Sequence, residues 1–356
     1  MMKSKGNRGI VVSMLLGLVA IAPAFAVQPF TVIADGLAFP RGLTFGPGGR
    51  LYVAQAGAGG GSATGKITEI RNPGQASQTI NDLVTGLISV TSPEGDVISV
   101  AGLSAIGNGT IYAAMETSNL QTGFTSLLGH LLKASQGGQF RDVADVGDFD
   151  WAFSIAHHDL APRDFPDSNP YGVLALANNL YVADAATNTL DLVNPDGSIS
   201  ILAYFPNNAI ADATPTCIAQ GPDGALYIGT LALVDSLVFG PSAKVYRVVP
   251  SETNPNDFNT VLNVATLWTS NLWPINGCAF GPDGSFYVSE LITGPGFAGG
   301  DVVKIPFATP AVHTSLTNDG LTFPAGVAVG PDGSVYVANG TTGAPDKGQV
   351  VRLTNH

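Results

Sequence analysis

The chain is poor in cysteine, in charge and in helical periodicity. It has two cysteines in 356 residues, Cys217 and Cys278, so a network of disulfides does not hold it together and it must fold around its own core. Charged residues make up only 12% of the chain, and few segments repeat apolar residues at the 3.6-residue period of an amphipathic helix. Short β-type runs, separated by many of the 44 glycines and 24 prolines, predominate instead. The composition therefore favours an all-β fold rich in turns.

A hydrophobic run of membrane-spanning length is also missing. The apolar run at residues 10–21 has about twelve residues, whereas a spanning helix needs about 20. It follows the basic segment "MMKSKGNRG" and is followed by "AFA", the small-x-small pattern of a cleavage site. We therefore predict that residues 1–26 are a signal peptide, that cleavage after Ala26 leaves Val27 as the new N-terminus, and that the mature protein is secreted or periplasmic.

Positive charge is scarce. The chain has 15 Lys and Arg against 27 Asp and Glu, and losing the three basic residues of the signal peptide changes the formal net charge from −12 to −15. A chain this acidic is repelled by nucleic acid and by anionic lipid. The sequence therefore predicts neither a nucleic-acid partner nor a membrane partner.

What the chain does contain is a repeat. The repeated unit is "GPDGALYIGT" (221–230), "GPDGSFYVSE" (281–290), "GPDGSVYVAN" (330–339), "GPGGRLYVAQ" (46–55), "ALANNLYVAD" (175–184) and "AIGNGTIYAAM" (105–115). Each copy resembles a β-hairpin, because glycine supplies the positive φ that the turn between two β-rich runs requires. A third strand such as "GKITEI" and a shorter fourth strand follow each hairpin. Four strands repeated six times predict an all-β, six-bladed β-propeller.

The two ends of the chain carry nearly the same phrase, "GLAFPRGLTF" from Gly36 and "GLTFPAGVAV" from Gly320. The last unit ends on its third strand, and "PFTVIADGLAFP" at the start has the form of a fourth strand leading into a first. We therefore predict that the N-terminal strand completes the last blade, with residues 30–34 antiparallel to 348–353. This closes one propeller domain over residues 27–356.

The six copies share a tyrosine and, two residues later, a small residue. These positions should be structural, because blades converge on the axis and the tyrosine ring fills the space between them. The tyrosines are Tyr52, Tyr112, Tyr181, Tyr227, Tyr287 and Tyr336, and the small residues are Ala54, Ala114, Ala183, Gly229, Ser289 and Ala338.

Two other positions differ from copy to copy, and topology places both at the channel end opposite the hairpins. One lies three residues after the tyrosine and the other at the start of the first strand. We predict that this mouth binds a ligand, the alternative being a solvated polar surface. The candidate residues are Arg41, Gln55, Tyr171, Asp184, Thr216, Thr230, Asn276, Glu290 and Asn339.

Among these candidates, Arg41, Asp184 and Glu290 are charged and lie on alternate blades. We expect them to approach the axis together, as a binding site or as an ion pair that plugs the channel. Asp184 and Glu290, with Asn276 and Asn339, are oxygen ligands of the kind that calcium accepts. Since such oxygens are common at any polar mouth, we predict no resident cofactor or metal, and calcium is the ion to test.

Two further features need an interpretation. Residues 142–170 form an insertion between blades two and three, either a cap with solvated acids or a lid that turns Phe149 and Trp151 toward a ligand. Aligned by their tyrosines, Cys217 and Cys278 occupy adjacent repeat positions, so we expect their side chains to point to opposite sides and to remain free thiols.

The ordered set of motifs resembles the ScyD/ScyE family, exported propeller proteins associated with scytonemin biosynthesis. It comprises "PRGLTFGPGGRLYVAQAGAGG", "DSNPYGV", "YVADAATNTLDLVNPDG", "PTCIAQGPDGALYIGTL" and "KVYRV", and covers nearly the whole mature chain. The resemblance implies export and an NHL-like propeller. Many relatives have an acidic residue where this chain has Gln55 and Thr230, which weakens a metal site at the mouth.

Two functional hypotheses remain. In the first, the protein is a monomeric, non-catalytic scaffold that binds an aromatic small molecule or a protein partner at the channel mouth. In the second, it is a lactonase-like hydrolase that uses a central metal ion. An ordered cation with three or more carboxylate or amide ligands would favour the second, and an apolar groove under the loops at 116–129 and 230–242 would favour the first.

Overall fold

The repeated hairpins are present in the computed structural model, which describes residues 29–124 and 126–353. The glycine of each Pro-Asp-Gly turn has the positive φ that the turn requires, at +80° in Gly224, +76° in Gly284 and +83° in Gly333. Each turn joins the first strand of a blade to its second strand. The predicted signal peptide, residues 1–26, lies outside the described residues.

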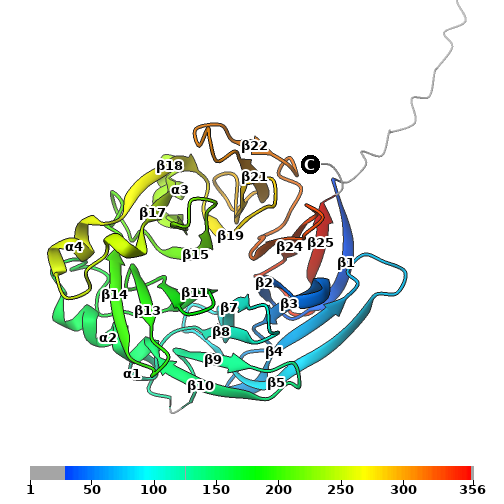
Figure 1. Ribbon diagram of the computed structural model, residues 1–356, viewed down its shortest axis with the longest axis horizontal. Helices are drawn as coiled ribbons and strands as arrows, with labels where there is room; N and C mark the ends of the chain where they lie inside the picture. Colours follow the sequence, from blue (N-terminus) through cyan, green and yellow to red (C-terminus); the bar gives the residue numbers. More distant parts are fainter. Residues whose placement is uncertain (1–28, 125, 354–356) are drawn as a thin grey trace, which may run out of the picture.

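Six antiparallel sheets stand around a central axis, so the predicted all-β, six-bladed propeller is confirmed (Figure 1). Blade one contains β2 (Pro40–Gly46), β3 (Arg50–Gln55), β4 (Ser62–Arg71), β5 (Thr79–Thr91) and the short β6 (Val97–Ile98). Blade two contains β7 (Val100–Ala105), β8 (Ile111–Met115), β9 (His130–Ala134) and β10 (Phe140–Asp145), and blade three contains β11 (Pro170–Ala175), β12 (Leu180–Asp184), β13 (Thr189–Val193) and β14 (Ile199–Tyr204). Blade four contains β15 (Pro215–Gln220), β16 (Leu226–Thr230), β17 (Ala243–Val248) and β18 (Thr266–Leu272). Blade five contains β19 (Ile275–Phe280), β20 (Phe286–Glu290), β21 (Asp301–Ile305) and β22 (Thr314–Ser315), and blade six contains β23 (Val327–Val329), β24 (Val335–Asn339), β25 (Gly348–Leu353) and β1 (Phe30–Leu37).

The N-terminal strand closes the ring as predicted. β1 pairs antiparallel with β25, with Phe30 opposite Leu353 and Val32 opposite Val351. In Figure 1 the blue β1 lies along the red β25, at the outer edge of blade six. The ring therefore has no unpaired sheet edge between its first and last blades.

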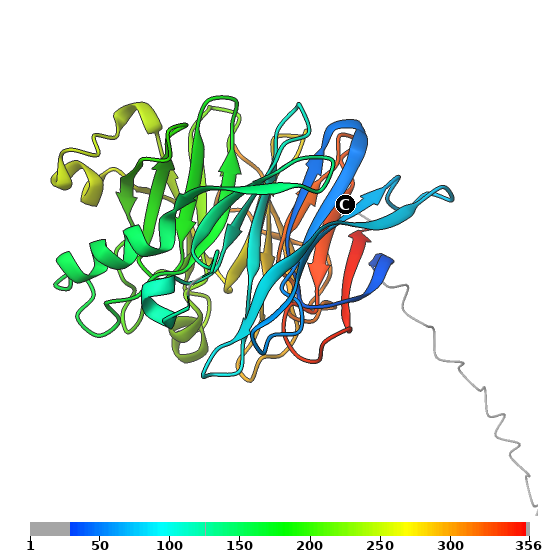
Figure 2. The same cartoon turned by 90° about the horizontal axis from the view of Figure 1, so that it is seen from below.

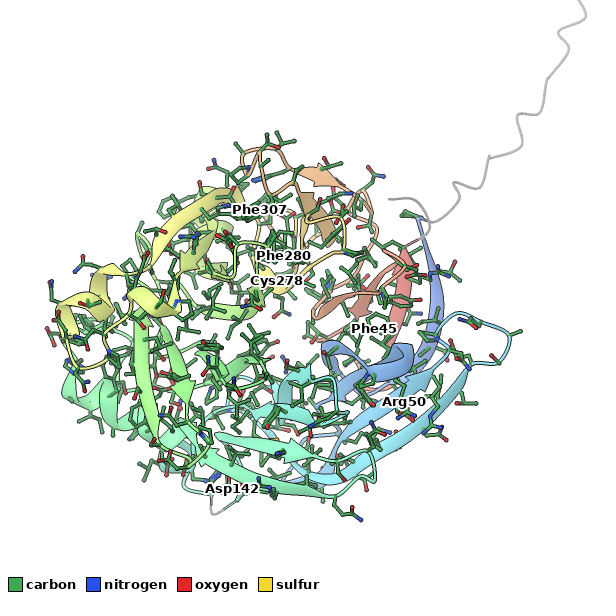
Figure 3. The ribbon with its side chains drawn as sticks, viewed as in Figure 1. Phe45, Arg50, Asp142, Cys278, Phe280 and Phe307 are labelled. Carbon is green, nitrogen blue, oxygen red and sulfur yellow. A yellow bond between two sulfur atoms is a disulfide. The ribbon has the colours of Figure 1, made fainter. Side chains whose placement is uncertain are left out.

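The shared tyrosines are buried between blades, as expected for a structural position. Tyr227 of blade four is 1% exposed and packs edge-to-face on Phe280 of blade five, with ring centroids 5.1 Å apart. Phe280 and Phe307 are labelled on blade five in Figure 3. The hydroxyl groups of Tyr227 and Tyr287 donate to Asp223 and Asp283, the aspartates of their own Pro-Asp-Gly turns. The turn aspartate thus anchors the hairpin to the tyrosine beside it.

A ring of glycines lets the inner strands of neighbouring blades pack backbone against backbone around the channel. A Cβ atom on Gly42 would lie 2.5 Å from the carbonyl oxygen of Ala101 in the next blade, and one on Gly326 would lie 2.5 Å from that of Arg41. The ring positions are Gly42, Gly102, Gly172, Cys217, Gly277 and Gly326. Blade four is therefore the exception, because its residue at this position is a cysteine.

The expectation of two free thiols is wrong, because Cys217 and Cys278 form a disulfide with their Cα atoms 5.7 Å apart. Cys217 lies opposite Gly229 and Cys278 opposite Val288, so they do occupy adjacent repeat positions. The two side chains project from opposite faces of their own sheets. In a ring of blades, however, one face of blade four packs against the opposite face of blade five. Opposite orientation on neighbouring blades therefore brings the two sulfur atoms together.

The helices of the described residues are short and peripheral. They are α1 (Asn119–Thr122), α2 (Val146–Ala156), α3 (Leu233–Phe239) and α4 (Phe258–Asn263), with 3₁₀ turns η1 (Pro47–Gly49) and η2 (Pro250–Glu252). Figure 2 shows α1 and α3 on the side opposite the β2–β3 turn. Within residues 29–124 and 126–353, no helix has the length and apolarity needed to cross a membrane.

The insertion at 142–170 begins within β10 and continues as α2. Phe149 of α2 packs on a cluster at the outside of blade three that contains Phe165, Ile201 and Tyr204. Neither Phe149 nor Trp151 lines the channel cavities, so the structure does not place this segment as a lid.

Candidate ligand-binding site at the channel mouth

The channel widens toward the face opposite the hairpins, where the first strand of each blade begins. A narrow cavity of about 60 Å³ runs between the inner strands, and a wider one of about 670 Å³ opens at the mouth. Four predicted site residues, Arg41, Tyr171, Thr216 and Asn276, line both cavities. All four come from the start of a first strand, so that set of variable positions does face the channel.

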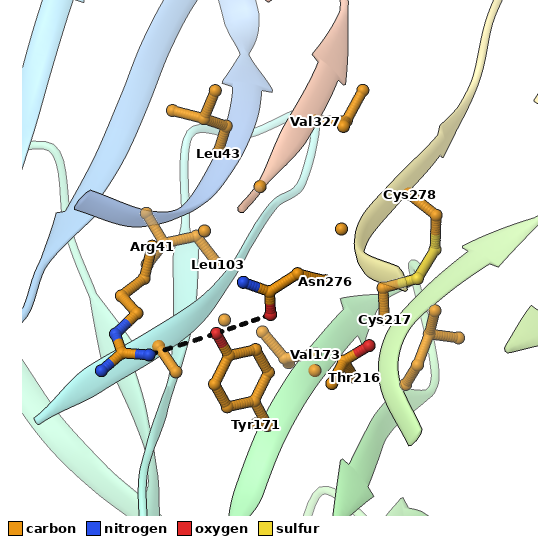
Figure 4. A pocket seen from close by; sticks show the side chains of 17 residues that line it. Arg41, Leu43, Leu103, Tyr171, Val173, Thr216, Cys217, Asn276, Cys278 and Val327 are labelled. Atoms are coloured by element: carbon orange, nitrogen blue, oxygen red, sulfur yellow. Dashed lines mark hydrogen bonds between the residues drawn. A yellow bond between two sulfur atoms is a disulfide. The ribbon is translucent and has the colours of Figure 1, made fainter. Parts of the chain in front are cut away.

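A chain of hydrogen bonds crosses the channel between three alternate blades (Figure 4). Arg41 Nη1 of blade one donates to the Tyr171 hydroxyl of blade three at 3.4 Å, and that hydroxyl donates to Asn276 Oδ1 of blade five at 3.0 Å. Burial raises the pKa of Tyr171, so the phenol stays protonated and acts as a donor. Thr216 of blade four donates to the carbonyl oxygen of Ile275 at 2.7 Å. Together these side chains form a polar floor beneath the mouth.

Arg41 is paired with an acid that the sequence did not single out. Its Nη1 lies 3.8 Å from Glu116 Oε1, and its Nη2 donates to the carbonyl oxygen of Val97 at 2.7 Å. Burial by itself would lower the pKa of Arg41, but the attraction of Glu116 and Tyr171 outweighs it and raises that pKa. The guanidinium is therefore a permanent cation. Its Nε is buried and has no hydrogen-bond partner.

The second set of variable residues serves one shared structural purpose. Four of the five predicted residues in it have a side-chain oxygen that accepts a backbone N–H from the segment just before the first strand of the same blade. The bonds are Ala38 N to Gln55 at 2.8 Å, Asn169 N to Asp184 at 2.8 Å, Trp273 N to Glu290 at 2.9 Å and Thr322 N to Asn339 at 2.8 Å. Thr230 differs, since its hydroxyl bonds to the backbone of Lys244. None of these five residues lines either channel cavity.

The expected meeting of Arg41, Asp184 and Glu290 at the axis is therefore wrong. Asp184 is fully buried and accepts from the N–H groups of Asn169, Ala186 and Thr187. Burial raises the pKa of Glu290 to about 7, against the opposing effect of the Trp273 N–H. Both carboxylates are held by local backbone, so Arg41 pairs with Glu116 instead.

Aromatic side chains line one side of the opening of the wide cavity. Phe39, Phe297 and Phe323 line it, and the rings of Phe297 and Phe323 lie 6.4 Å apart. Phe39, Phe297 and Phe323 have φ of +52°, +60° and +46°, which is rare for bulky residues and costs conformational energy. Such strain is found mainly where the surroundings fix a side chain for a purpose. The sequence did contain an indication of these mouth phenylalanines, because Phe39 and Phe323 occupy equivalent positions in the repeated phrase "GLAFP" and "GLTFP".

A metal centre built from the predicted oxygen ligands does not form. In residues 29–124 and 126–353, no group of three or more His, Cys, Asp and Glu side chains is placed to hold a metal ion. Asp184, Glu290 and Asn339 are engaged by backbone N–H groups, and Asn276 faces Tyr171. The residues that the sequence offered for calcium thus point to separate partners.

Comparison with known proteins places this chain among β-propeller proteins on the basis of its fold. No protein-family model and no curated protein matches the chain. Among solved structures, a putative oxidoreductase (glucose dehydrogenase) from Thermus thermophilus is similar with a TM-score of 0.56 and 14% identity, over 91% of this chain and 99% of that one. The PQQ-bound aldose sugar dehydrogenase from Streptomyces coelicolor has a TM-score of 0.52 and 14% identity over 90% and 96%, and a streptogramin B lyase has 0.51 and 17% over 92% and 97%. At these identities the likeness shows a shared propeller fold.

Proposed function

We propose that this chain is an exported, monomeric β-propeller that binds a small aromatic molecule at its channel mouth without transforming it. The observation that carries the proposal is the wide cavity of about 670 Å³, with phenylalanines on one side of its opening and a polar floor. Binding sites for small molecules have this size and this arrangement, in which apolar walls supply affinity and a few polar groups supply orientation. The resemblance to the ScyD/ScyE family supports export.

The side chains at the mouth suit binding better than catalysis. None of the four histidines in the described part of the chain lines either cavity. Burial raises the pKa of Tyr171, so the phenol stays protonated and does not act as a base, and the carboxylate of Glu116 is paired with Arg41 at 3.8 Å. The metal-dependent lactonase alternative required Asp184, Glu290, Asn276 and Asn339 to face one point, and their hydrogen bonds turn them to separate partners.

A thermal-shift and calorimetry screen tests the proposal. Purified mature protein would be mixed with indolic and phenolic compounds, with simple lactones, and with calcium, zinc or EDTA. We expect saturable binding of at least one aromatic class that EDTA leaves unchanged. Hydrolysis of a lactone that EDTA abolishes would instead support the hydrolase, and the absence of binding by every compound would refute the proposed function.

A matched pair of variants locates the binding site. Phe297 lines the mouth and Phe239 of α3 does not, although both are exposed, at 51% and 60%. Phe297→Ala should weaken binding several-fold and leave the melting temperature unchanged, because an exposed ring contributes little to folding. Phe239→Ala should change neither. Equal losses of affinity in both variants would place the ligand outside the mouth.

A further inference from the structure

We propose that the mouth selects uncharged aromatic ligands that present an oxygen acceptor to Arg41. This inference rests on the proposed function and specifies the chemistry of its ligand. It is carried by three features of the wide cavity: unused donor capacity at Arg41, an excess of acidic side chains, and the side of the cavity on which the phenylalanines lie.

The guanidinium of Arg41 has unused donor capacity. It carries five N–H donors, and its hydrogen bonds are the 2.7 Å bond to Val97 and the long 3.4 Å bond to Tyr171. Nε is buried without a partner, and so is Oγ1 of Thr341, another residue of the same cavity. Buried polar groups normally have partners, since an unpaired one costs about 1–3 kcal/mol. An acceptor atom of a ligand would supply what these groups lack.

The charges around the cavity argue against a carboxylate ligand. Arginine commonly binds carboxylates, but Glu116 already fills that role at 3.8 Å. Glu94 and Asp96 also line the cavity, whereas Arg41 is its only basic lining residue in the described part of the chain. An anion entering the mouth would therefore meet net negative charge. A carbonyl or phenol oxygen accepts a hydrogen bond from Arg41 without that repulsion.

The phenylalanines indicate where the ring of the ligand lies. Phe39 precedes β2 of blade one, Phe323 precedes β23 of blade six, and Phe297 follows β20 of blade five. Arg41 lies two residues after Phe39, at the start of β2. A planar molecule held against this side of the cavity would direct a substituent oxygen toward the polar floor.

Three probes of nearly the same size separate these contributions. They are 3-methylindole, which has no oxygen, indole-3-carboxaldehyde, which has an uncharged acceptor, and indole-3-carboxylate, which has a charged one. We expect the aldehyde to bind tightest by calorimetry, with the carboxylate weaker by about tenfold and the methyl compound weaker by several-fold. A carboxylate that binds as tightly as the aldehyde overturns the inference and leaves the proposed function standing. Absence of binding by all three also overturns the inference, and it overturns the proposed function as well if the phenolic compounds of the screen do not bind either.

Removing the charge of Glu116 tests the inference, because a purely structural role of this residue would leave the ligand preference unchanged. Glu116→Gln keeps the shape and the oxygen that accepts from Ser99 N at 3.0 Å, but removes the charge opposed to Arg41. We expect it to strengthen binding of the carboxylate and to narrow or reverse the preference for the aldehyde. Thr341→Val, which removes one hydroxyl, should weaken the aldehyde and leave 3-methylindole unchanged. An unaltered preference in both variants would contradict the assignment.

Discussion

Cys217 of blade four is joined by a disulfide to Cys278 of blade five, 61 residues further along the chain. The bond spans the one place in the inner ring where a cysteine stands in the position of a glycine. A cross-link that closes a loop of this length stabilises a fold by about 2–4 kcal/mol, chiefly by restricting the unfolded chain. We expect the oxidised protein to show no thiol that a maleimide labels under denaturing, non-reducing conditions.

Blade six supplies the residues for a matched test of the disulfide. The double variant Cys217→Gly/Cys278→Val introduces the pair found there, Gly326 and Val327, so it removes the bond without adding a foreign side chain. Its free energy of unfolding, measured in urea, should be about 2–4 kcal/mol lower than that of the oxidised protein. Dithiothreitol should lower the stability of the parent and not of the variant; a variant as stable as the parent would show that the bond contributes nothing.

Three buried aspartates make stability depend on pH. Asp150 of α2, Asp184 and Asp191 are fully buried, and both oxygens of Asp150 and Oδ1 of Asp191 have no hydrogen-bond donor. Burial, reinforced by the neighbouring acids, raises the pKa of Asp150 and of Asp191 well above the ordinary value. The folded state therefore holds protons more tightly than the unfolded chain. The stability that this tighter proton binding contributes is fully present below about pH 4, and it is lost as the pH rises through the raised pKa values.

Other acids at the same side of blade three act in the same direction. Burial raises the pKa of Asp167 to about 6 and that of Asp212 to about 7. Urea unfolding between pH 4.5 and 9 should show decreasing stability, and Asp150→Asn should flatten the decrease and raise stability at neutral pH. Asp159→Asn, an exposed change nearby, should leave the profile as it is. Stabilisation of the parent by calcium, absent in Asp150→Asn, would show that a cation rather than a proton neutralises the three acids.

The glycine ring predicts a sharp contrast between two alanine substitutions. A Cβ atom at Gly277 would lie 2.5 Å from the carbonyl oxygen of Ala325 in the next blade, whereas one at Gly107, in an exposed hairpin, would meet nothing within 4 Å. Gly277→Ala should therefore lower the free energy of unfolding by about 1–3 kcal/mol, the usual result of overpacking. Gly107→Ala should be neutral in the same chemical denaturation. Similar values for the two would mean that blades shift freely around the channel.

Ring closure predicts that the N-terminal strand is indispensable. Deleting residues 27–36 removes most of β1 and exposes the edge of β25, so we expect aggregation and a loss of cooperative unfolding by calorimetry. A synthetic peptide of residues 27–37 added in trans should restore part of the cooperativity. A truncated protein that melts like the parent would contradict this role for β1.

The structural features that all blades share could be predicted, because a residue required in every blade recurs at the same position in the six copies of the repeat. The buried tyrosines, the turn glycines and the pairing of β1 with β25 follow from the repeat itself. Variation between copies was a weaker guide. Gln55 and Glu290 differ in charge, yet each has a side-chain oxygen that accepts a backbone N–H. Their different residue types therefore did not indicate the structural role that they share.

The other contacts at the mouth could not be predicted from the sequence, because they join parts of the chain that are far apart in it. Glu116 meets Arg41 only because blades one and two are neighbours at their inner ends, and no local pattern in the sequence indicates that pair. The disulfide was missed for a related reason, since side-chain direction was compared within one blade and not across the space between two.

The pairing of β1 with β25 also sets the order of events while the protein is made. Phe30 is among the first of the described residues to be synthesised and its partner Leu353 among the last. Until β25 has emerged, β1 has no strand to join and blade six lacks one side. If the chain is exported N-terminus first, as we propose, the ring can close only after the final strand has crossed the membrane, because β25 is then the last part of the sheet to arrive.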